Sequence, residues 1–279
     1  MTDRPLTYIV KDQRPLVHQA DDTVRNACRA MRERRTGSVL VVDSRDRLVG
    51  IFTGRDAVRL VAKGKDADKT PLAMAMTRDP VTVTPRDRAV DGLRAMNEGS
   101  FRHVPVMQDG KVLGVVSRGD FKGMEFEAYR WRMISQSRSA SNRSLGEIVA
   151  KQRPLVLATD ATVANACRSM WQHKSGSVLV ADKRHRLKGI FTGRDTVRVL
   201  AKAKNAAATR LSKAMTPDPA ALPPESQAIE ALRAMNDGGF RHVPVVENGK
   251  ILGVVSRNDF TGGEIDQLDE EEHLAESIW

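Results

Sequence analysis

Apolar residues follow two spacings along this chain, and the two spacings recur in a fixed order. Within 24–31 they fall at i, i+3, i+4 and i+7, the pattern of one helix face, and either Asp22 or Thr23 can cap that helix. Continuous apolar runs follow at 39–42 and 48–52, as expected of strands that are covered on both faces. With a short extended segment before them and a helix after them, the predicted order is strand, helix, strand, strand, helix.

This pattern occurs four times because the sequence is duplicated twice. RPLVHQADDTVRNACRAM at 14–31 matches RPLVLATDATVANACRSM at 153–170, and the same offset of 139 residues relates 99–121 to 238–260 without insertion or deletion. Within each half, the segment at 113–120 repeats a segment 64 residues earlier. A unit of about 60 residues buries too little surface to be stable alone, so we expect units to pair and share a core.

The repeats define two modules, a linker and a tail. The linker is polar and rich in serine, without apolar periodicity. The predicted boundaries are 1–134 for the first module (units about 8–70 and 71–134), 135–144 for the linker, 145–263 for the second module (units about 145–209 and 210–263) and 264–279 for an acidic tail.

Charge is divided unevenly between the body and the tail. The whole chain has a formal charge of +10, but residues 264–279 hold seven carboxylates and no lysine or arginine, which leaves +17 on the body. So basic a body attracts anions such as nucleotide phosphates, nucleic acid or acidic proteins, although a solvated basic surface explains the charge equally well. One hypothesis is that the tail folds back on the body or competes with an anionic ligand.

The sequence also limits the compartment. No apolar run approaches the ~20 residues that a membrane span needs, and the first residues lack the apolar core of a signal peptide. Cys28 and Cys167 lie at matching positions inside helical patterns, which indicates small buried side chains rather than a disulfide. We therefore expect a cytoplasmic protein with no membrane partner.

The repeated stretch GIFTGRD, at 50–56 and 189–195, has the chemistry of a ligand site. A strand that leads into a helix N-terminus presents free backbone N–H groups, which favour an anion. The aspartate can accept hydrogen bonds from two neighbouring hydroxyls, such as a ribose diol, and the adjacent arginine suits phosphate. Thr-x-x-Asp is also the spacing of a helix capping box, which requires no arginine, and the two roles can coexist.

Both copies fit the pattern Gly-apolar-apolar-[Ser/Thr]-x-x-Asp, which also occurs at 114–120 and 253–259. These four copies, with HVPV at 103–106 and 242–245 and DPVTV at 79–83, resemble the cystathionine-β-synthase (CBS) domain family. The resemblance extends from about Tyr8 to Phe260. It implies an α/β (α+β) fold with four CBS units, each a small sheet with two helices, arranged as two pseudo-symmetric CBS pairs (Bateman modules) in a flat disc. Since one chain supplies all four units, a single-chain disc or a homodimer is expected.

The resemblance implies that an adenosyl ligand binds between paired units, and it assigns three groups of residues. The ribose ligands would be Asp56, Asp120, Asp195 and Asp259. The phosphate ligands would be Thr53, Arg55, Ser117, Arg118, Thr192, Arg194, Ser256 and Arg257, together with Arg102, His103, Arg241 and His242. The adenine would be clasped by Met76, Thr77, Pro80 and Val81 in one site and by Met215, Thr216, Pro219 and Ala220 in another.

The four predicted sites are not equivalent. The counterparts of Arg102 and His103 in the first unit are Gly37 and Ser38, which carry no charge. The Asp56 and Asp195 sites are expected to bind phosphate more strongly than the other two. Alternatively, His103 and His242 are hydrogen-bonded structural histidines at strand starts.

No motif of an enzyme is present: no phosphate-binding glycine loop, no nucleophile with a base, and no cysteine or histidine cluster with metal spacing. We therefore predict a non-catalytic regulatory sensor of AMP, ADP or ATP, with no metal of its own and no obligatory cofactor, although Mg²⁺ could accompany the nucleotide. Ligand binding would alter the activity of an unidentified partner protein. One alternative is a nucleic-acid-binding protein, based on the basic body and AYRWRMISQSRSASNR at 128–143; the other is a scaffold subunit with unused sites.

This interpretation has a direct consequence for mutagenesis. If the aspartates act mainly on the ribose, replacing Asp56 and Asp195 with alanine should weaken nucleotide binding and leave the melting temperature of the free protein unchanged.

Overall fold

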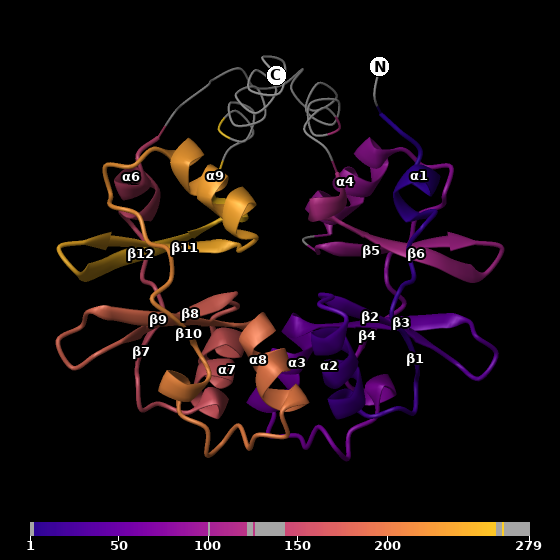
Figure 1. Cartoon of the computed structure of the whole chain (residues 1–279), viewed down its shortest axis with the longest axis horizontal. Helices are drawn as coiled ribbons and strands as arrows, with labels where there is room; N and C mark the ends of the chain where they lie inside the picture. The colour runs from indigo at the N-terminus through magenta and orange to yellow at the C-terminus, as the bar shows by residue number, and fades with distance from the viewer. Residues whose placement is uncertain (1–2, 100, 122–124, 126–142, 261–263, 265–279) are drawn as a thin grey trace.

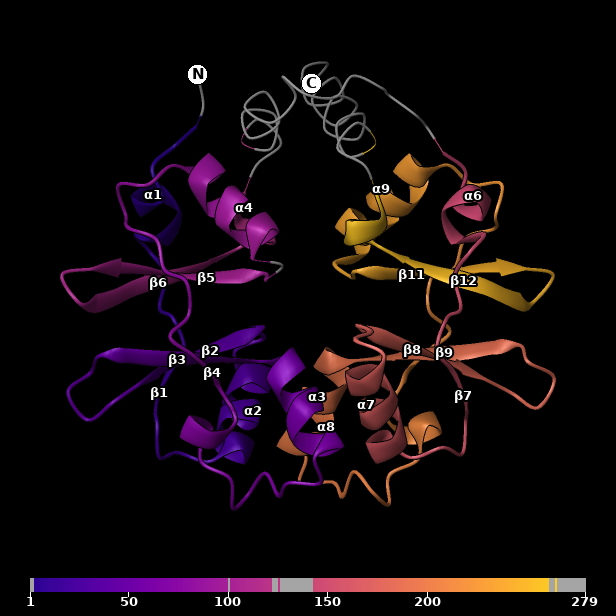
Figure 2. The same ribbon diagram turned by 180° about the vertical axis from the view of Figure 1, so that it is seen from behind.

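A computed structural model describes residues 3–99, 101–121, 125, 143–260 and 264, with only the backbone described at Arg118 and Asn258. The four units lie around a common centre (Figure 1), the first module on the right and the second on the left. The view from behind shows the same arrangement (Figure 2), with the first and third units adjacent along one edge. The four-unit α/β architecture predicted from the repeats is confirmed.

The two modules contain the same elements in the same order. Those of the first module are α1 (Thr7–Val10), β1 (Val17–Gln19), α2 (Val24–Glu33), β2 (Ser38–Val42), β3 (Leu48–Thr53), α3 (Gly54–Ala62), η1 (Leu72–Met74), β4 (Thr77–Arg78), α4 (Ala89–Glu98), β5 (His103–Gln108), β6 (Lys111–Ser117) and η2 (Arg118–Asp120). Those of the second are α6 (Leu145–Val149), β7 (Val156–Ala158), α7 (Val163–Gln172), β8 (Ser177–Ala181), β9 (Leu187–Thr192), α8 (Gly193–Ala201), η4 (Leu211–Lys213), β10 (Thr216–Pro217), α9 (Ala228–Gly238), β11 (His242–Glu247), β12 (Lys250–Ser256) and η5 (Arg257–Asp259).

The sheet of the first unit has the order β1-β2-β3-β4, and the third unit repeats it with β7 to β10. β1 pairs with β2 in parallel, whereas β2–β3 and β3–β4 are antiparallel. All five residues of β2 are buried, as the continuous apolar run predicts for a strand covered on both faces. β4 belongs to the stretch that we assigned to the second unit, so the link between the units completes the sheet of the first.

The second and fourth units have smaller sheets. β5 and β6 form an antiparallel pair, and Val83 adds a single parallel bridge to Val106. The repeat predicts a first strand for this unit at about 80–83, and within the described residues it is reduced to this one bridge. The repeat also predicts a helix after β6, of which the turn η2 lies within the described residues.

Short helices at the start of each module pack onto the second unit of that module rather than the first. Leu6 and Val10, beside and within α1, lie in the same core as Leu93 and Val116. In the second module, α6 contributes Leu145 and Val149 to the core of the fourth unit. The unit boundaries at 8 and 145 are therefore corrected: these helices cover apolar faces of the small sheets, and the first and third units begin after them.

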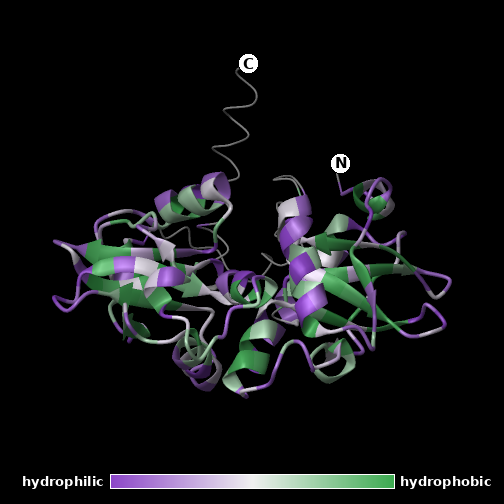
Figure 3. Ribbon diagram, turned by 60° about the horizontal axis from the view of Figure 1, so that its bottom comes forward, coloured by the Kyte–Doolittle hydropathy of each residue, from purple (hydrophilic) through white to green (hydrophobic). Residues whose placement is uncertain are grey.

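The two modules meet through helices. α2 contacts α8, and α3 contacts both α7 and α8, so the first and third units share one hydrophobic core. Figure 3 shows that the strands are mostly hydrophobic and the connecting loops mostly hydrophilic. Among the described residues, the cores of the second and fourth units are separate from each other.

Gly54 and Gly193 lie at the point of closest approach between the modules. A Cβ on Gly54 would lie 3.0 Å from the backbone carbon and oxygen of Gly193, and a Cβ on Gly193 would lie 2.9 Å from the oxygen of Gly54. These glycines are the fifth residues of the two GIFTGRD copies. The repeated motif therefore brings two helix N-termini into backbone contact.

Two further expectations are answered by the structure. Cys28 and Cys167 are buried and form no disulfide, as predicted, and burial raises the pKa of each thiol to about 12. Within the part of the chain that the structure describes, no helix combines the length and hydrophobicity needed to cross a bilayer.

Candidate functional site

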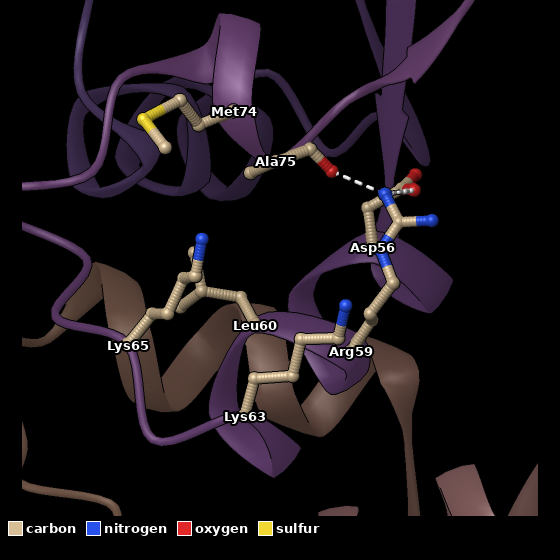
Figure 4. A pocket seen from close by; sticks show the side chains of 7 residues that line it. All are labelled: Asp56, Arg59, Leu60, Lys63, Lys65, Met74 and Ala75. Carbon is tan, nitrogen blue, oxygen red and sulfur yellow. Dashed lines mark hydrogen bonds and ion pairs between the residues drawn. The ribbon is translucent and has the colours of Figure 1, made fainter.

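Asp56 lies buried in the first turn of α3, and its carboxylate is fully hydrogen-bonded within the chain. Oδ2 accepts from the backbone N–H and the hydroxyl of Thr53, both at 2.9 Å. Oδ1 accepts from the guanidinium of Arg59 at 2.8 Å and from the hydroxyl of Thr77 at 3.0 Å. Arg59 also donates to the carbonyl oxygen of Ala75 at 2.5 Å (Figure 4). Both oxygens of the proposed ribose ligand are thus occupied by the protein.

Asp195 repeats this geometry in the third unit. Oδ2 accepts from the N–H and hydroxyl of Thr192 at 2.8 and 2.9 Å. Oδ1 accepts from Arg198 at 2.7 Å and from Thr216 at 3.2 Å. The capping box that we considered as the structural alternative is present in both copies, with an arginine added to it.

Burial dominates the electrostatics of these two carboxyl groups. It raises the pKa of Asp56 and of Asp195 above the ordinary value of 3.8, although Arg59 and Arg198 and the threonine hydrogen bonds act in the opposite direction. A buried carboxylate of this kind is stable only while its donors remain in place.

Asp120 and Asp259 occupy the same motif position in the second and fourth units, but they are only half-buried. Oδ2 of Asp120 accepts from the N–H and hydroxyl of Ser117 at 2.6 and 2.8 Å, and Oδ2 of Asp259 accepts from Ser256 at 2.7 Å twice. Among the described residues, Oδ1 of each aspartate accepts no hydrogen bond. These two carboxylates therefore retain an oxygen for a ligand hydroxyl.

A buried ion pair supports the backbone beside each of these aspartates. Arg4 donates to the carbonyl oxygen of Asp120 at 2.9 Å and pairs with Glu125. Arg143 donates to the carbonyl oxygen of Asp259 at 3.0 Å and pairs with Glu264 at 2.8 Å. Glu264 is only 1% exposed. It was assigned to the acidic tail, and this boundary is corrected because a buried, paired carboxylate belongs to the folded module.

The structure brings part of the predicted adenine clasp next to Asp56. Thr77 bonds to its carboxylate, and Met76 packs on Gly50, where a Cβ would lie 2.3 Å from Sδ. Further along this segment, Val81 is 53% exposed. The second module has the same arrangement, with Met215 on Gly189 and Thr216 on Asp195, and with Pro219 half-buried and Ala220 exposed, as Pro80 and Val81 are.

His103 and His242 lie at the junction of all four units. A Cβ on Gly37 of the first unit would lie 2.8 Å from Nε2 of His103, and a Cβ on Gly176 would lie 2.8 Å from Nε2 of His242. Each half-buried imidazole thus fills space that the glycine of the paired unit leaves open. The uncharged counterparts noted in the sequence provide room for the histidines.

The electrostatics of these histidines show that the two modules approach each other here. Burial, then the charges of Arg241 and Arg102, lower the pKa of His103 to about 3. Burial, then Arg102 and Arg241, lower the pKa of His242 to about 4. Two arginines and two neutral imidazoles from opposite modules therefore form one cluster, which we call the central basic cluster.

The other predicted phosphate ligands have varied positions. Arg55 and Arg194 are exposed in the first turns of α3 and α8, whereas Arg257 is half-buried. The side chain of Arg118 lies outside the described residues. Ser38, beside Gly37, is 2% exposed, and its hydroxyl has no hydrogen-bond partner within the described part of the chain.

Sequence reasoning missed the arginines that saturate the first and third sites. Arg59 and Arg198 lie three residues after the motif aspartate, and i, i+3 is a contact spacing on a helix, so this signal was present. Arg4 and Arg143, with Glu125 and Glu264, were also missed. They recur at the 139-residue offset, but their partners lie 121 residues away, which no local pattern reveals.

The nucleic-acid alternative was based on the basic body and on the stretch 128–143. That stretch lies outside the described residues except for Arg143, which is used in the ion pair with Glu264. No cluster of three His, Cys, Asp or Glu side chains that could hold a metal occurs within the described residues.

Comparison with known proteins agrees with the duplicated fold. The family model described as the CBS domain matches residues 19–63, 72–123 and 211–262. The chain is 31% identical over 251 residues to the CBS domain-containing protein CBSCBSPB2 of Arabidopsis thaliana, covering 81% of this chain and 47% of that protein. It is 28% identical to the meiotically up-regulated gene 70 protein of Schizosaccharomyces pombe, covering 84% and 40%. The chain spans about half the length of the curated plant relatives it matches.

The solved structure of protein MJ1225 from Methanocaldococcus jannaschii has the same fold. The two superpose with a TM-score of 0.70 over 95% of this chain and 99% of that one, at 15% identity. The fold and the site thus define a class of protein: a duplicated α/β chain with paired small sheets and the same motif at the end of a strand in each unit. The chain belongs to the CBS domain family.

Proposed function

We propose that this chain is a non-catalytic regulatory protein that binds adenine nucleotides, namely AMP, ADP or ATP, between its paired units. The central basic cluster is the observation that supports this most strongly. His103 and His242 are packed against glycines of their paired units, with Arg102 and Arg241 close enough to depress both pKa values. Phosphate groups at this point would neutralise charges contributed by both modules.

The geometry favours two of the four aspartates as ribose ligands. Asp120 and Asp259 each keep one oxygen without a partner among the described residues, whereas both oxygens of Asp56 and Asp195 are saturated. A ribose at Asp56 would first have to displace Arg59 or Thr77. We therefore propose nucleotide binding in the second and fourth units, which reverses the order expected from the sequence.

A regulatory effect follows from the position of the cluster between the modules. A ligand that contacts both modules binds one relative orientation better than another, and this difference in affinity is what shifts a conformational equilibrium. The regulated partner would then respond to the altered orientation.

The test is isothermal titration of AMP, ADP and ATP, with and without Mg²⁺, into wild type and Arg102→Ala/Arg241→Ala. We expect the double variant to bind at least about tenfold more weakly, because charge-assisted contacts are lost. Arg45→Ala/Arg184→Ala is the matched control, since these residues are also related by the 139-residue offset but are exposed in hairpin turns. Equal affinity in the two double variants would refute the proposal, and no binding to wild type would favour the scaffold alternative.

A further inference from the structure

A basic pocket lies at the C-terminal end of α3, on the first module. It is a shallow pocket with a cavity volume of about 40 Å³, and its lining includes Asp56, Arg59, Lys63, Lys65 and Met74. Figure 4 shows the amino groups of Lys63 and Lys65 and the guanidinium of Arg59 around the same space. The pocket shares Asp56 with the motif site, but none of its lining belongs to the central basic cluster.

The charges around this pocket do not balance. Asp56 is its single acidic residue, and the bonds that saturate its carboxylate include one from Arg59. Lys63 and Lys65 are exposed and form no ion pair within the described part of the chain. Two uncompensated ammonium groups therefore face a pocket that already contains a guanidinium. Mutual repulsion of these groups is relieved when an anion binds between them.

Arg59, which lines the pocket, contacts a side chain of the other module. The guanidinium carbon of Arg59 lies 6.0 Å from the centroid of the Trp171 ring, which α7 of the third unit supplies. This cation–π contact, with the bonds to Asp56 and Ala75, fixes the direction of the guanidinium. Arg59 is thus preorganised for a ligand rather than mobile on the surface.

The duplication does not reproduce this wall. The residue that corresponds to Trp171 in the first unit is Arg32, which has no aromatic face, and the residue that corresponds to Met74 is Lys213. Arg198, the counterpart of Arg59, has a side chain that is 42% exposed, against 28% for Arg59. The lysines themselves are duplicated, as Lys202 and Lys204. Both modules therefore have the two lysine amino groups, but among the described residues only the first module has an aromatic ring beside the corresponding arginine.

We infer that this pocket is a second anion site, specific to the first module, that takes a phosphate group through Arg59, Lys63 and Lys65. The phosphate could be free, as in pyrophosphate, or could belong to a nucleotide. Basic residues at a helix C-terminus also stabilise the helix dipole, but that role would be the same at Lys202 and Lys204 and requires no contact with Trp171.

The experiment uses the full chain with Arg102→Ala/Arg241→Ala as background, so that the central basic cluster does not contribute. Pyrophosphate and ATP are titrated by calorimetry into this background, into the same protein with Lys63→Ala/Lys65→Ala, and into the matched variant Lys202→Ala/Lys204→Ala. We expect the dissociation constant to rise about tenfold in the first lysine variant and to stay unchanged in the second. Trp171→Leu should weaken binding by about threefold, because Arg59 loses its orientation.

The outcomes separate the source of the phosphate. Loss of affinity for both ligands indicates a free-phosphate site, and loss for ATP alone indicates a site for a nucleotide tail. Equal losses in the two lysine variants, or none in either, would overturn the inference, because the contact would then be surface charge only. The proposed nucleotide function is tested separately by the central cluster, so either can fail without the other.

Discussion

The same four-residue motif has two different environments in the two kinds of unit, the larger first and third units and the smaller second and fourth units. In the first and third units, the aspartate is buried and its two oxygens accept four hydrogen bonds from the chain. In the second and fourth units, the bonds that the aspartate accepts from described residues are the two of its cap, both through Oδ2. The motif alone therefore does not define a ligand site; the residue three positions later and the neighbouring segment decide whether the carboxylate is available.

The position of the motif in the assembly explains this difference. Gly54 and Gly193 bring the N-termini of α3 and α8 into backbone contact at the module junction. Two helix N-termini facing each other repel through their dipoles, and a carboxylate in each first turn offsets that repulsion. We therefore expect Asp56 and Asp195 to stabilise the docking of the modules, whereas Asp120 and Asp259 lie at short turns that are not part of the shared core.

The largest expected difference between the two kinds of unit is in the free energy of unfolding that is lost when the motif aspartate is replaced. Asp56→Ala should lower the free energy of unfolding by about 2–4 kcal/mol, because the variant loses a cap and leaves Arg59 and two hydroxyls without their acceptor. Asp120→Ala should cost about 1 kcal/mol, the value of a cap alone. Urea denaturation followed by circular dichroism measures both.

Alanine at Asp56 and Asp195 should thus lower the melting temperature of the free protein, which the sequence alone predicted to stay unchanged. The matched pair Asp195→Ala and Asp259→Ala should give the same ranking in the second module. If all four variants lost the same stability, the proposed division between docking and ligand carboxylates would be wrong.

A smaller effect is expected from closing the glycine contact. Gly54→Ala places a Cβ 3.0 Å from the backbone of Gly193, so the helices must move apart. We expect a loss of about 1–3 kcal/mol, reduced somewhat by the better helix propensity of alanine. Gly119→Ala, in the second unit, is the control, since nothing lies within 4 Å of its Cβ position. A single unfolding transition that splits in two for Gly54→Ala would show that docking, rather than one unit, is weakened.

Local patterns predicted the elements well because the physics of those elements is local. The i, i+3, i+4, i+7 spacing placed Val24, Ala27, Cys28 and Met31 on one face, and all four are buried. Of the two caps considered for that helix, the structure uses Thr23, whose side chain accepts from the backbone of Asn26. The duplication then extended each correct element to the other module.

Non-local features were not predictable in the same way. Nothing in the short sequence of α1 indicates which of two adjacent sheets it covers, and the apolar face of the small sheet decides it. The pairing of Glu264 with Arg143 joins residues 121 positions apart. The hydrogen bond from Arg59 to Asp56 was predictable, since both residues lie on one predicted helix at i, i+3. The motif aspartate was assigned to a ligand only, without a partner from its own helix.

The central basic cluster lies where the two kinds of unit meet, and it should make the free energy of unfolding depend on pH. The pKa of His103 is about 3 and that of His242 about 4 in the folded protein, against about 6.5 when unfolded. Lowered folded values mean that the unfolded state takes up more protons between about pH 6.5 and 4, so stability is complete above this window and is lost as pH falls through it. We expect about 1–2 kcal/mol per histidine between pH 7 and 5.

The variant His103→Gln/His242→Gln should remove most of this slope, and His173→Gln, at an exposed helix end, should leave it unchanged. Saturating nucleotide should also flatten it, because a bound phosphate favours the imidazolium form. A slope that persists in the double variant would place the titrating groups elsewhere.

The smallest effect concerns a contact that only one side of the module junction has. Arg25 in α2 pairs with Asp68 and donates to the carbonyl oxygen of Leu200 at the end of α8. The corresponding residues of the second module are Ala164 and Ala207, which provide neither interaction. Arg25→Ala should therefore cost about 1 kcal/mol, the value of one hydrogen bond to a helix C-terminus with a partly exposed ion pair.

Arg168→Ala is the control for that last variant, since this arginine is exposed on α7 and, within the described residues, donates one hydrogen bond, at 3.5 Å, to the neighbouring Asn165. The reciprocal change, Ala164→Arg with Ala207→Asp, should recover a comparable stabilisation, because the pseudo-symmetry presents the carbonyl of Val61 at the corresponding helix end. A gain in stability from the reciprocal pair would show that the junction accommodates this contact on either side. The second module would then lack the contact because of its alanines and not because of its backbone geometry. No loss from Arg25→Ala would instead mean that the shared apolar core alone holds the two modules together.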